Sequence, residues 1–265
     1  MIDRSKFIGC LVGLAVGDAV GASFEGLYTF GAWEDVERVG ELRYTDDTHM
    51  AIGVAESLIT KGGFDGEHMA WTFVKNYDRE PYRGYGPGPP RVFSRLKSGE
   101  AWDRAAVEVY PGGSYGNGAA MRVAPLALLY YDNPEKLIDV VTMASRITHT
   151  HELGVEGAVI QAVSVSQALD SDPKAGLDPG AFVLNLRRYV KSMIYLEKIS
   201  YLERLLWGSP TIEEVATKLG NGIAAFESVP TAIYCFLSHK DSFRDCVRYA
   251  ISLGGDTDSF SVEVA

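Results

Sequence analysis

Residues 44–48 (YTDDT) and residues 254–259 (GGDTDS) each combine carboxylates with hydroxyl groups. Adjacent aspartates repel one another, and the start of a helix relieves only part of that repulsion. One interpretation of the first segment is a helix N-cap followed by acids in the first turn, which is a common arrangement. Two such segments in one chain favour a second interpretation, because carboxylate and hydroxyl oxygens without His or Cys suit Mg²⁺ or Mn²⁺ rather than zinc. Four carboxylates could hold two ions, with one aspartate shared between them.

A glycine-rich segment, GGSYGNG at residues 112–118, precedes a helical pattern and could bind an anion. Glycines ahead of a helix allow successive backbone N–H groups to converge on a phosphate, and the helix end adds positive potential. The same letters also match the G-x-S-x-G nucleophile elbow, with Ser114 as the nucleophile. That pattern requires a preceding strand and a parallel sheet, and the sequence predicts neither. We therefore favour anion binding over a serine hydrolase.

The histidines and the loop aromatics give weaker signals. His149 and His151 are two residues apart, so they do not share a helix face and form a poor metal pair. Each is open to three interpretations: a helix cap, a hydrogen-bonding core residue or a ligand contact. Tyr82, Arg83 and Tyr85 lie in a Pro- and Gly-rich loop, where they would either line a ligand or remain solvated.

These segments must be positioned by helices, because apolar residues recur with the helical period along most of the chain. The first helix carries Gly9, Gly13, Gly17 and Gly21 on one face, and we expect other helices to press against this bare backbone. The sequence predicts a single all-α domain over residues 1–265, with an irregular segment at 81–90 and a surface loop at 171–180. Its further helices are expected between YTDDT and residue 61, after residue 65, and at 92–96, 102–109, 119–130, 134–148, 153–169, 181–206, 211–220, 223–237 and 241–253.

The composition narrows the classes of partner. The chain has 265 residues and a formal net charge of −10. Such an acidic surface repels phosphate backbones and anionic lipids, so we expect neither nucleic-acid nor membrane binding. Three scattered cysteines favour a reducing compartment. The apolar run 8–16 superficially resembles a signal peptide, but Asp18 stands where cleavage requires small neutral residues.

Taken in their order along the chain, the motifs resemble the ADP-ribosylglycohydrolases, also called (ADP-ribosyl)hydrolases. The resemblance covers residues 9 to 259 and leaves mainly 171–205 unmatched. Two of the segments most resemble the branch that acts on serine-linked ADP-ribose, poly(ADP-ribose) and O-acetyl-ADP-ribose; these are GSYGNGAAMR and GNGIAAFESVP. The full set of matching segments reads GCLVGLAVGDAVGASFEG, YTDDT, RGYGPG, GSYGNGAAMR, ITHTHELG, LGNGIAAFESVPTAIYCFL and SLGGDTDS.

The resemblance implies a compact, orthogonal all-α fold with two Mg²⁺ ions, or Mn²⁺, at the base of a cleft. One ion would be held by YTDDT together with a bridging aspartate, and the other by acids and a hydroxyl from the N- and C-terminal motifs. Glu25 belongs to a loop that is thought to move aside for substrate in that branch. The ligands implied are Thr45, Asp46, Asp47 and the bridging Asp258 for the first ion, completed by Glu25, Asp256 and Ser259 for the second.

The resemblance also implies the reaction, which is hydrolysis of the glycosidic bond between ADP-ribose and its acceptor. We hypothesise that a water held by the ions attacks the anomeric carbon and that a carboxylate accepts its proton. The candidate catalytic residues are Glu25, Asp47, Asp256 and Asp258. The candidate substrate-binding residues are Asp46, Gly112, Gly113, Ser114, Tyr115, Gly116, Asn117 and Gly118, with His149 and Ile223 beside the adenosine.

The same resemblance implies ADP-ribosylated proteins and poly(ADP-ribose) as partners, a monomer, and a place in the cytoplasm, nucleus or mitochondrion during the DNA damage response. Ser259 stands where the family usually has threonine, and it keeps the hydroxyl. Family members continue past this motif with further helices, whereas this sequence ends in FSVEVA, so we expect those C-terminal helices to be lacking. Four alternatives stay open: an arginine-ADP-ribose hydrolase, a two-metal phosphohydrolase, an impaired ADP-ribose-binding or structural relative, and a serine hydrolase.

Overall fold

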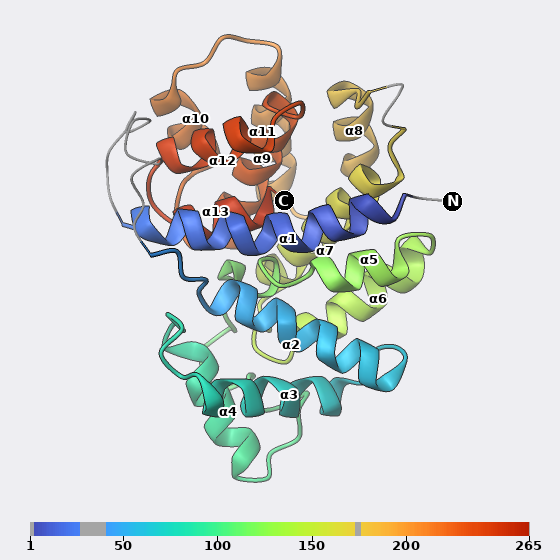
Figure 1. Cartoon of the computed structure of the whole chain (residues 1–265), viewed down its shortest axis with the longest axis vertical. Helices are drawn as coiled ribbons and strands as arrows, with labels where there is room; N and C mark the ends of the chain where they lie inside the picture. Colours follow the sequence, from blue (N-terminus) through green and yellow to red (C-terminus); the bar gives the residue numbers. More distant parts are fainter. Residues whose placement is uncertain (1–2, 27–40, 173–175, 265) are drawn as a thin grey trace.

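The computed structural model describes residues 3–26, 41–172 and 176–264 of the chain (Figure 1). Within these residues the fold contains helices and no strand, which confirms the predicted all-α class. The α-helices are α1 (Arg4–Gly21), α2 (Asp46–Lys61), α3 (Gly66–Arg79), α4 (Gly88–Lys97), α5 (Ala124–Tyr130), α6 (Pro134–Ser145), α7 (Glu152–Asp170), α8 (Pro179–Leu186), α9 (Met193–Leu206), α10 (Ile212–Leu219), α11 (Ala225–Ser238), α12 (Phe243–Ser252) and α13 (Thr257–Glu263). Short 3₁₀ helices are η1 (Ala22–Phe24), η3 (Asn117–Ala119) and η4 (Arg187–Tyr189).

Several helix boundaries follow directly from local chemistry. Helix α2 begins after Thr45, whose Oγ1 accepts a hydrogen bond from the amide of Asp47, and it ends at Gly62, which adopts the left-handed conformation with φ 67°. Helix α3 begins after Asp65, whose side chain accepts from the amide of His68. His151 caps α7 by accepting from the amide of Leu153, so the cap interpretation of that histidine is confirmed.

Four sequence expectations were wrong in their details. The helix expected at 181–206 is divided into α8 and α9, with η4 between them. Residues 102–109 form successive turns, because several of their backbone bonds span three residues, as from Val107 N to Arg104 O. The helix expected at 119–130 is shortened to α5, preceded by η3 and a turn in which Arg122 points inward over the ring of Phe73. Helix α4 begins at Gly88, inside the segment expected to be irregular, because prolines are tolerated in a first helical turn.

Helices α1 and α13 pack with their backbones nearly in contact, and Figure 1 shows them side by side. A Cβ atom built on Gly17 would lie 2.1 Å from the carbonyl oxygen of Ser261, and one on Gly21 would lie 2.4 Å from that of Thr257. Thr257 Oγ1 also donates to Gly21 O at 2.8 Å. A Cβ on Gly9, by contrast, would meet nothing within 4 Å. Close approach therefore explains two of the four glycines in the stripe.

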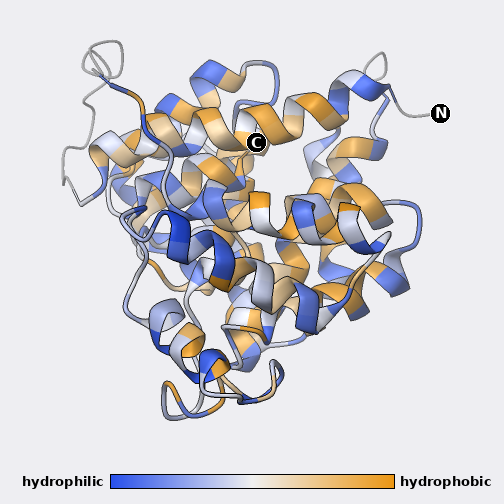
Figure 2. Cartoon of the chain, turned by 60° about the horizontal axis from the view of Figure 1, so that its bottom comes forward, coloured by the Kyte–Doolittle hydropathy of each residue, from blue (hydrophilic) through white to orange (hydrophobic). Residues whose placement is uncertain are grey.

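Helix α1 is largely apolar (Figure 2), and part of its surface is exposed. Ile8, Val12 and Val16 are exposed and line a cavity of about 850 Å³ between α1, α7, α11 and α12. By length and hydropathy, residues Arg4–Phe24 could cross a membrane. In this fold 39% of that stretch is buried, and the segment packs one face against α13.

Candidate metal centre and adjoining glycine loop

The first acidic segment occupies the start of α2. Asp46 and Asp47 are the first two residues of the helix, directly after the Thr45 N-cap. The side chain of Asp47 is buried, whereas Asp46 is half-buried. The N-cap interpretation and the metal interpretation are therefore compatible, because the cap fixes the backbone from which both carboxylates project.

The second acidic segment is shaped by two glycines and a short helix. Gly254 and Gly255 have φ angles of 66° and 80°, which side-chain-bearing residues rarely adopt. A Cβ on Gly255 would also lie 1.9 Å from Asn221 O, so no side chain fits there. This turn places Asp256 at the N-cap position of α13, with Asp258 in its first turn.

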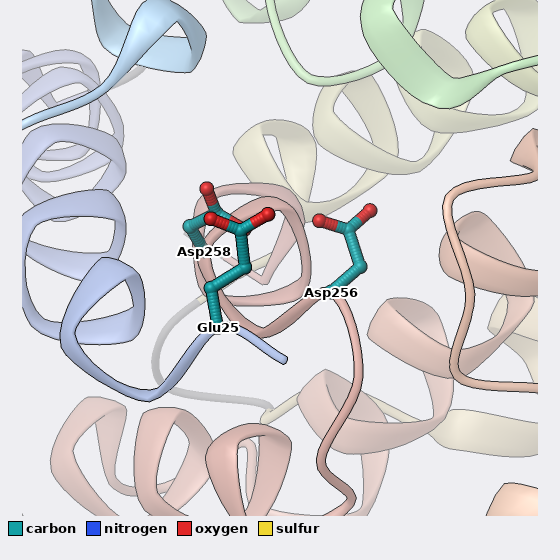
Figure 3. Close-up of side chains that lie close together, drawn as sticks. All are labelled: Glu25, Asp256 and Asp258. Carbon is teal, nitrogen blue, oxygen red and sulfur yellow. The ribbon is translucent and has the colours of Figure 1, made fainter. Parts of the chain in front are cut away.

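The fold brings the two acidic segments together with the turn after α1. Ser259 Oγ donates to Asp47 Oδ2 at 2.9 Å, which joins α13 to α2. Glu25, Asp256 and Asp258 each direct a carboxylate oxygen to one region, and these oxygens lie within 4.8 Å of one another (Figure 3). The amide of Gly26 donates to Gly255 O at 3.0 Å and ties the Glu25 turn to the double-glycine turn.

The electrostatics of this cluster favour a bound cation. Burial, followed by the charge of Asp258, raises the pKa of Asp46 to about 7. Burial, followed by the charge of Asp256, raises the pKa of Asp258 to about 8. The same causes hold the pKa of Asp47 well above its ordinary value. Divalent cations would offset both the desolvation and the mutual repulsion, so this set of hard oxygen donors fits Mg²⁺ or Mn²⁺.

The glycine-rich loop lies next to this cluster. Gly116 forms an antiparallel bridge with Ala224, and the amide of Asn117 donates to Ile223 O at 2.9 Å. Asn117 Nδ2 donates to Asp256 Oδ2 at 2.6 Å, which connects the loop directly to the acidic cluster. Ile223 itself is 70% exposed at the edge of this loop pair. The loop, the cluster and Ile223 therefore belong to one continuous site.

Two details of this loop differ from what the sequence predicts. A short 3₁₀ turn follows the loop, rather than the start of a long α-helix, so the expected dipole of a full helix is reduced. His149 lies buried beneath the loop, where a Cβ on Gly118 would come within 2.7 Å of its ring. Burial, followed by the charge of Arg122, lowers the pKa of His149 to about 3, so its imidazole is neutral.

A nucleophilic role for Ser114 finds no support in its surroundings. The preceding residues form turns, and the described part of the chain holds no strand that could build a nucleophile elbow. Ser114 Oγ accepts a hydrogen bond from the amide of Gly116 at 3.3 Å, as in an ordinary turn. Its side chain therefore shapes the loop.

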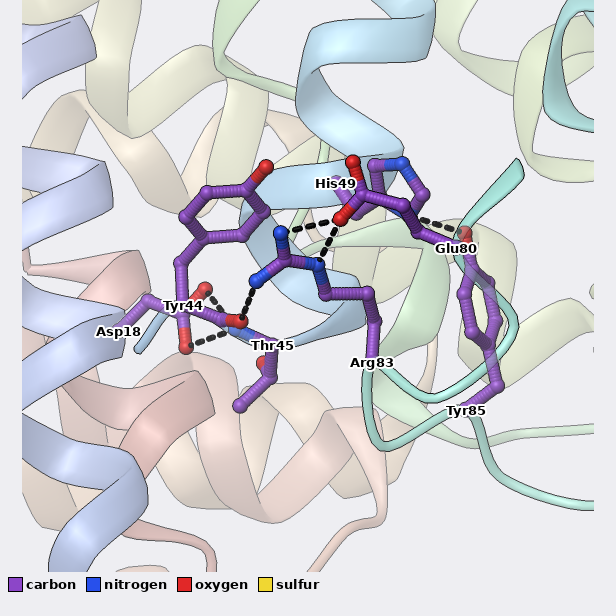
Figure 4. A network of polar contacts seen from close by, with 7 residues as sticks. All are labelled: Asp18, Tyr44, Thr45, His49, Glu80, Arg83 and Tyr85. Carbon is purple, nitrogen blue, oxygen red and sulfur yellow. Dashed lines mark hydrogen bonds and ion pairs between the residues drawn. The ribbon is translucent and has the colours of Figure 1, made fainter. Parts of the chain in front are cut away.

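Reasoning from the sequence missed a polar network that lies behind the acidic cluster (Figure 4). Asp18 of α1 accepts from the backbone amide of Thr45. On the outer side, Arg83 donates to Tyr44 O at 3.2 Å and stacks over the Tyr44 ring at 3.9 Å. Tyr85, from the same loop as Arg83, bonds to His49 at 3.0 Å and packs into the core. The only signal for Asp18 was an acidic residue that follows a long apolar, glycine-rich stretch of α1.

The fold and the site together define an all-helical protein with a carboxylate-rich centre for hard cations beside a glycine loop. The profile of the ADP-ribosylglycohydrolase family matches residues 1–262. The chain is similar to "ADP-ribosylhydrolase ARH3" of Homo sapiens, with 36% identity over 97% of this chain and 82% of the human protein. It is 35% identical to "ADP-ribosylhydrolase ARH3" of Danio rerio, over 97% of this chain and 80% of that one.

A structural comparison agrees with these matches. A solved structure described as an "ADP-ribosylglycohydrolase-related protein complex" superposes with a TM-score of 0.74 and 27% identity, over 98% of this chain and 84% of that one. The chain belongs to the ADP-ribosylglycohydrolase family. Members of this family are ADP-ribosyl hydrolases, which are glycosidases, and they depend on a metal.

Proposed function

We propose that this protein hydrolyses the bond that joins ADP-ribose to serine, to a further ADP-ribose unit or to an acetyl group, and that it does so with two Mg²⁺ ions. The observation that carries the proposal is the meeting of three distant segments in one cluster of hard oxygen donors. Mn²⁺ would suit the same donors. The cluster is continuous with a glycine loop of the kind that binds phosphates.

The ligands proposed for the two ions are those that the family resemblance implies, and three of them, Glu25, Asp256 and Asp258, bring their carboxylate oxygens within 4.8 Å of one another. Thr45, Asp46, Asp47 and Asp258 would hold one ion, and Glu25, Asp256 and Ser259 would complete the other, with Asp258 shared. When bound, the ions would supply Lewis-acid activation and compensate negative charge on the substrate.

The chain's own groups would orient the substrate. Backbone amides of residues 112–118 would bind the diphosphate, while the exposed side chains of Tyr115 and Ile223 would contact the adenosine. His149, which we expected beside the adenosine, would act from beneath by supporting the backbone of Gly118. The anomeric carbon would then face the carboxylates, which favour the positive charge that develops on the ribose ring during cleavage.

Glu25 is the best-placed group to move a proton. It is exposed at the edge of the cluster, with a carboxylate oxygen within 4.8 Å of those of Asp256 and Asp258, so a water held there would be within its reach. Glu25, or one of the aspartates, would accept the proton of the water that attacks the anomeric carbon and pass it to the acceptor oxygen as the bond to that oxygen breaks.

The test is turnover on a serine-ADP-ribosylated peptide, with Mg²⁺ and with EDTA, followed by product analysis. We expect intact ADP-ribose and free peptide, and we expect D256N and D258N to lower turnover ~100-fold or more, the scale of losing one charge-stabilising group. D139N, which changes an exposed aspartate on α6, is the matched control and should retain turnover.

Each alternative has its own outcome. AMP and ribose phosphate as products would indicate a phosphohydrolase, and faster cleavage of an arginine-linked peptide would indicate the arginine branch. Binding of ADP-ribose without turnover in saturating Mg²⁺ would indicate a binding protein. Wild-type turnover by both aspartate variants would remove the proposed centre altogether.

A further inference from the structure

Asp18 is a fully buried aspartate that faces the start of α2. Its two carboxylate oxygens accept from the amide of Thr45 at 3.0 and 2.9 Å. One of them, Oδ2, also accepts from the amide of Thr48 at 3.0 Å and from Thr48 Oγ1 at 2.5 Å. Both oxygens of the buried side chain are therefore engaged by one short segment of another helix (Figure 4).

The position of these bonds matters because they flank the proposed metal ligands. The first amides of a helix have no partner within the helix and need an acceptor from elsewhere. Here Asp18 binds the amide just before Asp46 and the amide just after Asp47. These bonds fix the backbone on both sides of the two ligand aspartates. The direction of their carboxylates is thereby set by α1.

A neutral residue could satisfy a helix start at lower electrostatic cost. The carboxylate of Asp18 acts electrostatically on Asp46, Asp47 and Asp258, so its negative charge adds to the repulsion within the cluster. In the same network Arg83 pairs with Glu80 and donates to Tyr44 O, and the described residues show no ion pair that would offset the charge of Asp18. A divalent ion held by the neighbouring aspartates would do so, since attraction in a buried site extends beyond direct ligands.

We propose that Asp18 is a positioning residue of the metal centre, which presets the YTDDT segment for ligation and adds negative charge that strengthens cation binding. The inference rests on the proposed function in one respect: Asp46 and Asp47 must hold the ion. Asp18 itself touches neither the ion nor the substrate. Its effect should therefore appear in metal affinity before any substrate is added.

The experiment is a titration of the full chain with Mn²⁺, followed by electron paramagnetic resonance, with urea unfolding in EDTA measured in parallel. D18N keeps the shape of the side chain and removes one acceptor oxygen and the charge. T48V removes the hydroxyl donor at nearly constant volume, and T48S restores it. S57A is the matched control, because Ser57 is a fully buried residue of the same helix, with its hydroxyl bonded to His68 at 2.8 Å.

We expect D18N to weaken Mn²⁺ binding ~10- to 100-fold, the range found for residues that orient metal ligands. T48V should weaken it by a smaller factor, T48S should recover it, and S57A should keep wild-type affinity even where it unfolds at lower urea. The proposal would be overturned if Mn²⁺ affinity fell in proportion to the free energy of unfolding across wild type, S57A and D18N.

The outcomes separate this inference from the proposed function. If wild-type protein binds no Mn²⁺, the proposed metal centre itself fails. If wild-type protein binds Mn²⁺ and D18N or T48V binds it equally well, only the role of Asp18 fails. Should D18N not fold, the comparison of T48V with T48S and S57A decides the question on its own.

Discussion

The contact between α1 and α13 makes a quantitative prediction about Gly17. An alanine there would place its Cβ 2.1 Å from Ser261 O, whereas ordinary contact begins at 3.4 Å, so the helices must separate locally by about 1.3 Å. Overpacking of this kind costs about 1–3 kcal/mol, and the helix gains about 1 kcal/mol because alanine is the better helix former. We expect Gly17→Ala to lower the free energy of unfolding by up to about 2 kcal/mol, since the two terms leave a net loss of about 0–2 kcal/mol.

Gly9→Ala is the matched control on the same helix. A Cβ at Gly9 would meet nothing within 4 Å, so only the helix-forming gain remains, and this variant should be more stable by about 0.5–1 kcal/mol. The stability of each variant is measured by urea unfolding in EDTA. Its Mn²⁺ affinity is measured separately by titration of the folded protein. Because α13 carries Asp258 and Ser259, Gly17→Ala should also weaken Mn²⁺ binding. A Gly17→Ala protein as stable as Gly9→Ala would refute the close packing of the two helices.

Further predictions concern the charges and polar contacts of the site. In EDTA, the free energy of unfolding should fall as pH rises from 5 to 8. The folded protein raises the pKa of Asp46 to about 7 and that of Asp258 to about 8, so both side chains hold a proton in the folded state that they lose in the unfolded state. Measured by urea unfolding, the free energy of unfolding should change less with pH when Mg²⁺ is present or in the D46N/D258N variant. A free energy of unfolding that rises from pH 5 to pH 8 would contradict the raised pKa values. Ser114→Ala should retain most turnover on the serine-linked peptide, and a ~10³-fold loss would return the serine nucleophile to consideration. Asn117→Asp should lower unfolding stability in EDTA by about 1–3 kcal/mol, because it replaces a donor 2.6 Å from Asp256 with a like charge; unchanged stability would argue against this contact.

Features encoded by neighbouring residues could be predicted from the sequence. The start of α2 at Thr45, its end at Gly62 and the start of α3 at Asp65 depend on caps that operate within a few residues. The two acidic segments could be recognised by their unusual composition, and a resemblance across the whole chain pointed to their joint use.

Features that depend on distant contacts could not be predicted. Asn117 was expected to bind substrate through the glycine loop, but its side chain reaches Asp256, which is 139 residues away and leaves no local signal. The contacts of Asn117 and the inward turn of Arg122 override the continuous helical pattern of residues 119–130. Asp18 was noticed only as a residue that argues against signal-peptide cleavage, because the amides that it binds lie at the start of another helix.

The pairing of α1 with α13 has a consequence during synthesis on the ribosome. The bond between Gly21 and Thr257 spans 236 residues, so α1 leaves the ribosome long before its partner exists. Until then its apolar surface is bare, and such exposed segments are prone to aggregate or to be held by chaperones. Contacts of this separation also slow folding, because the intervening chain must be ordered before they form. The acidic cluster is therefore completed only when α13 docks, and a nascent chain stalled before α13 would lack it.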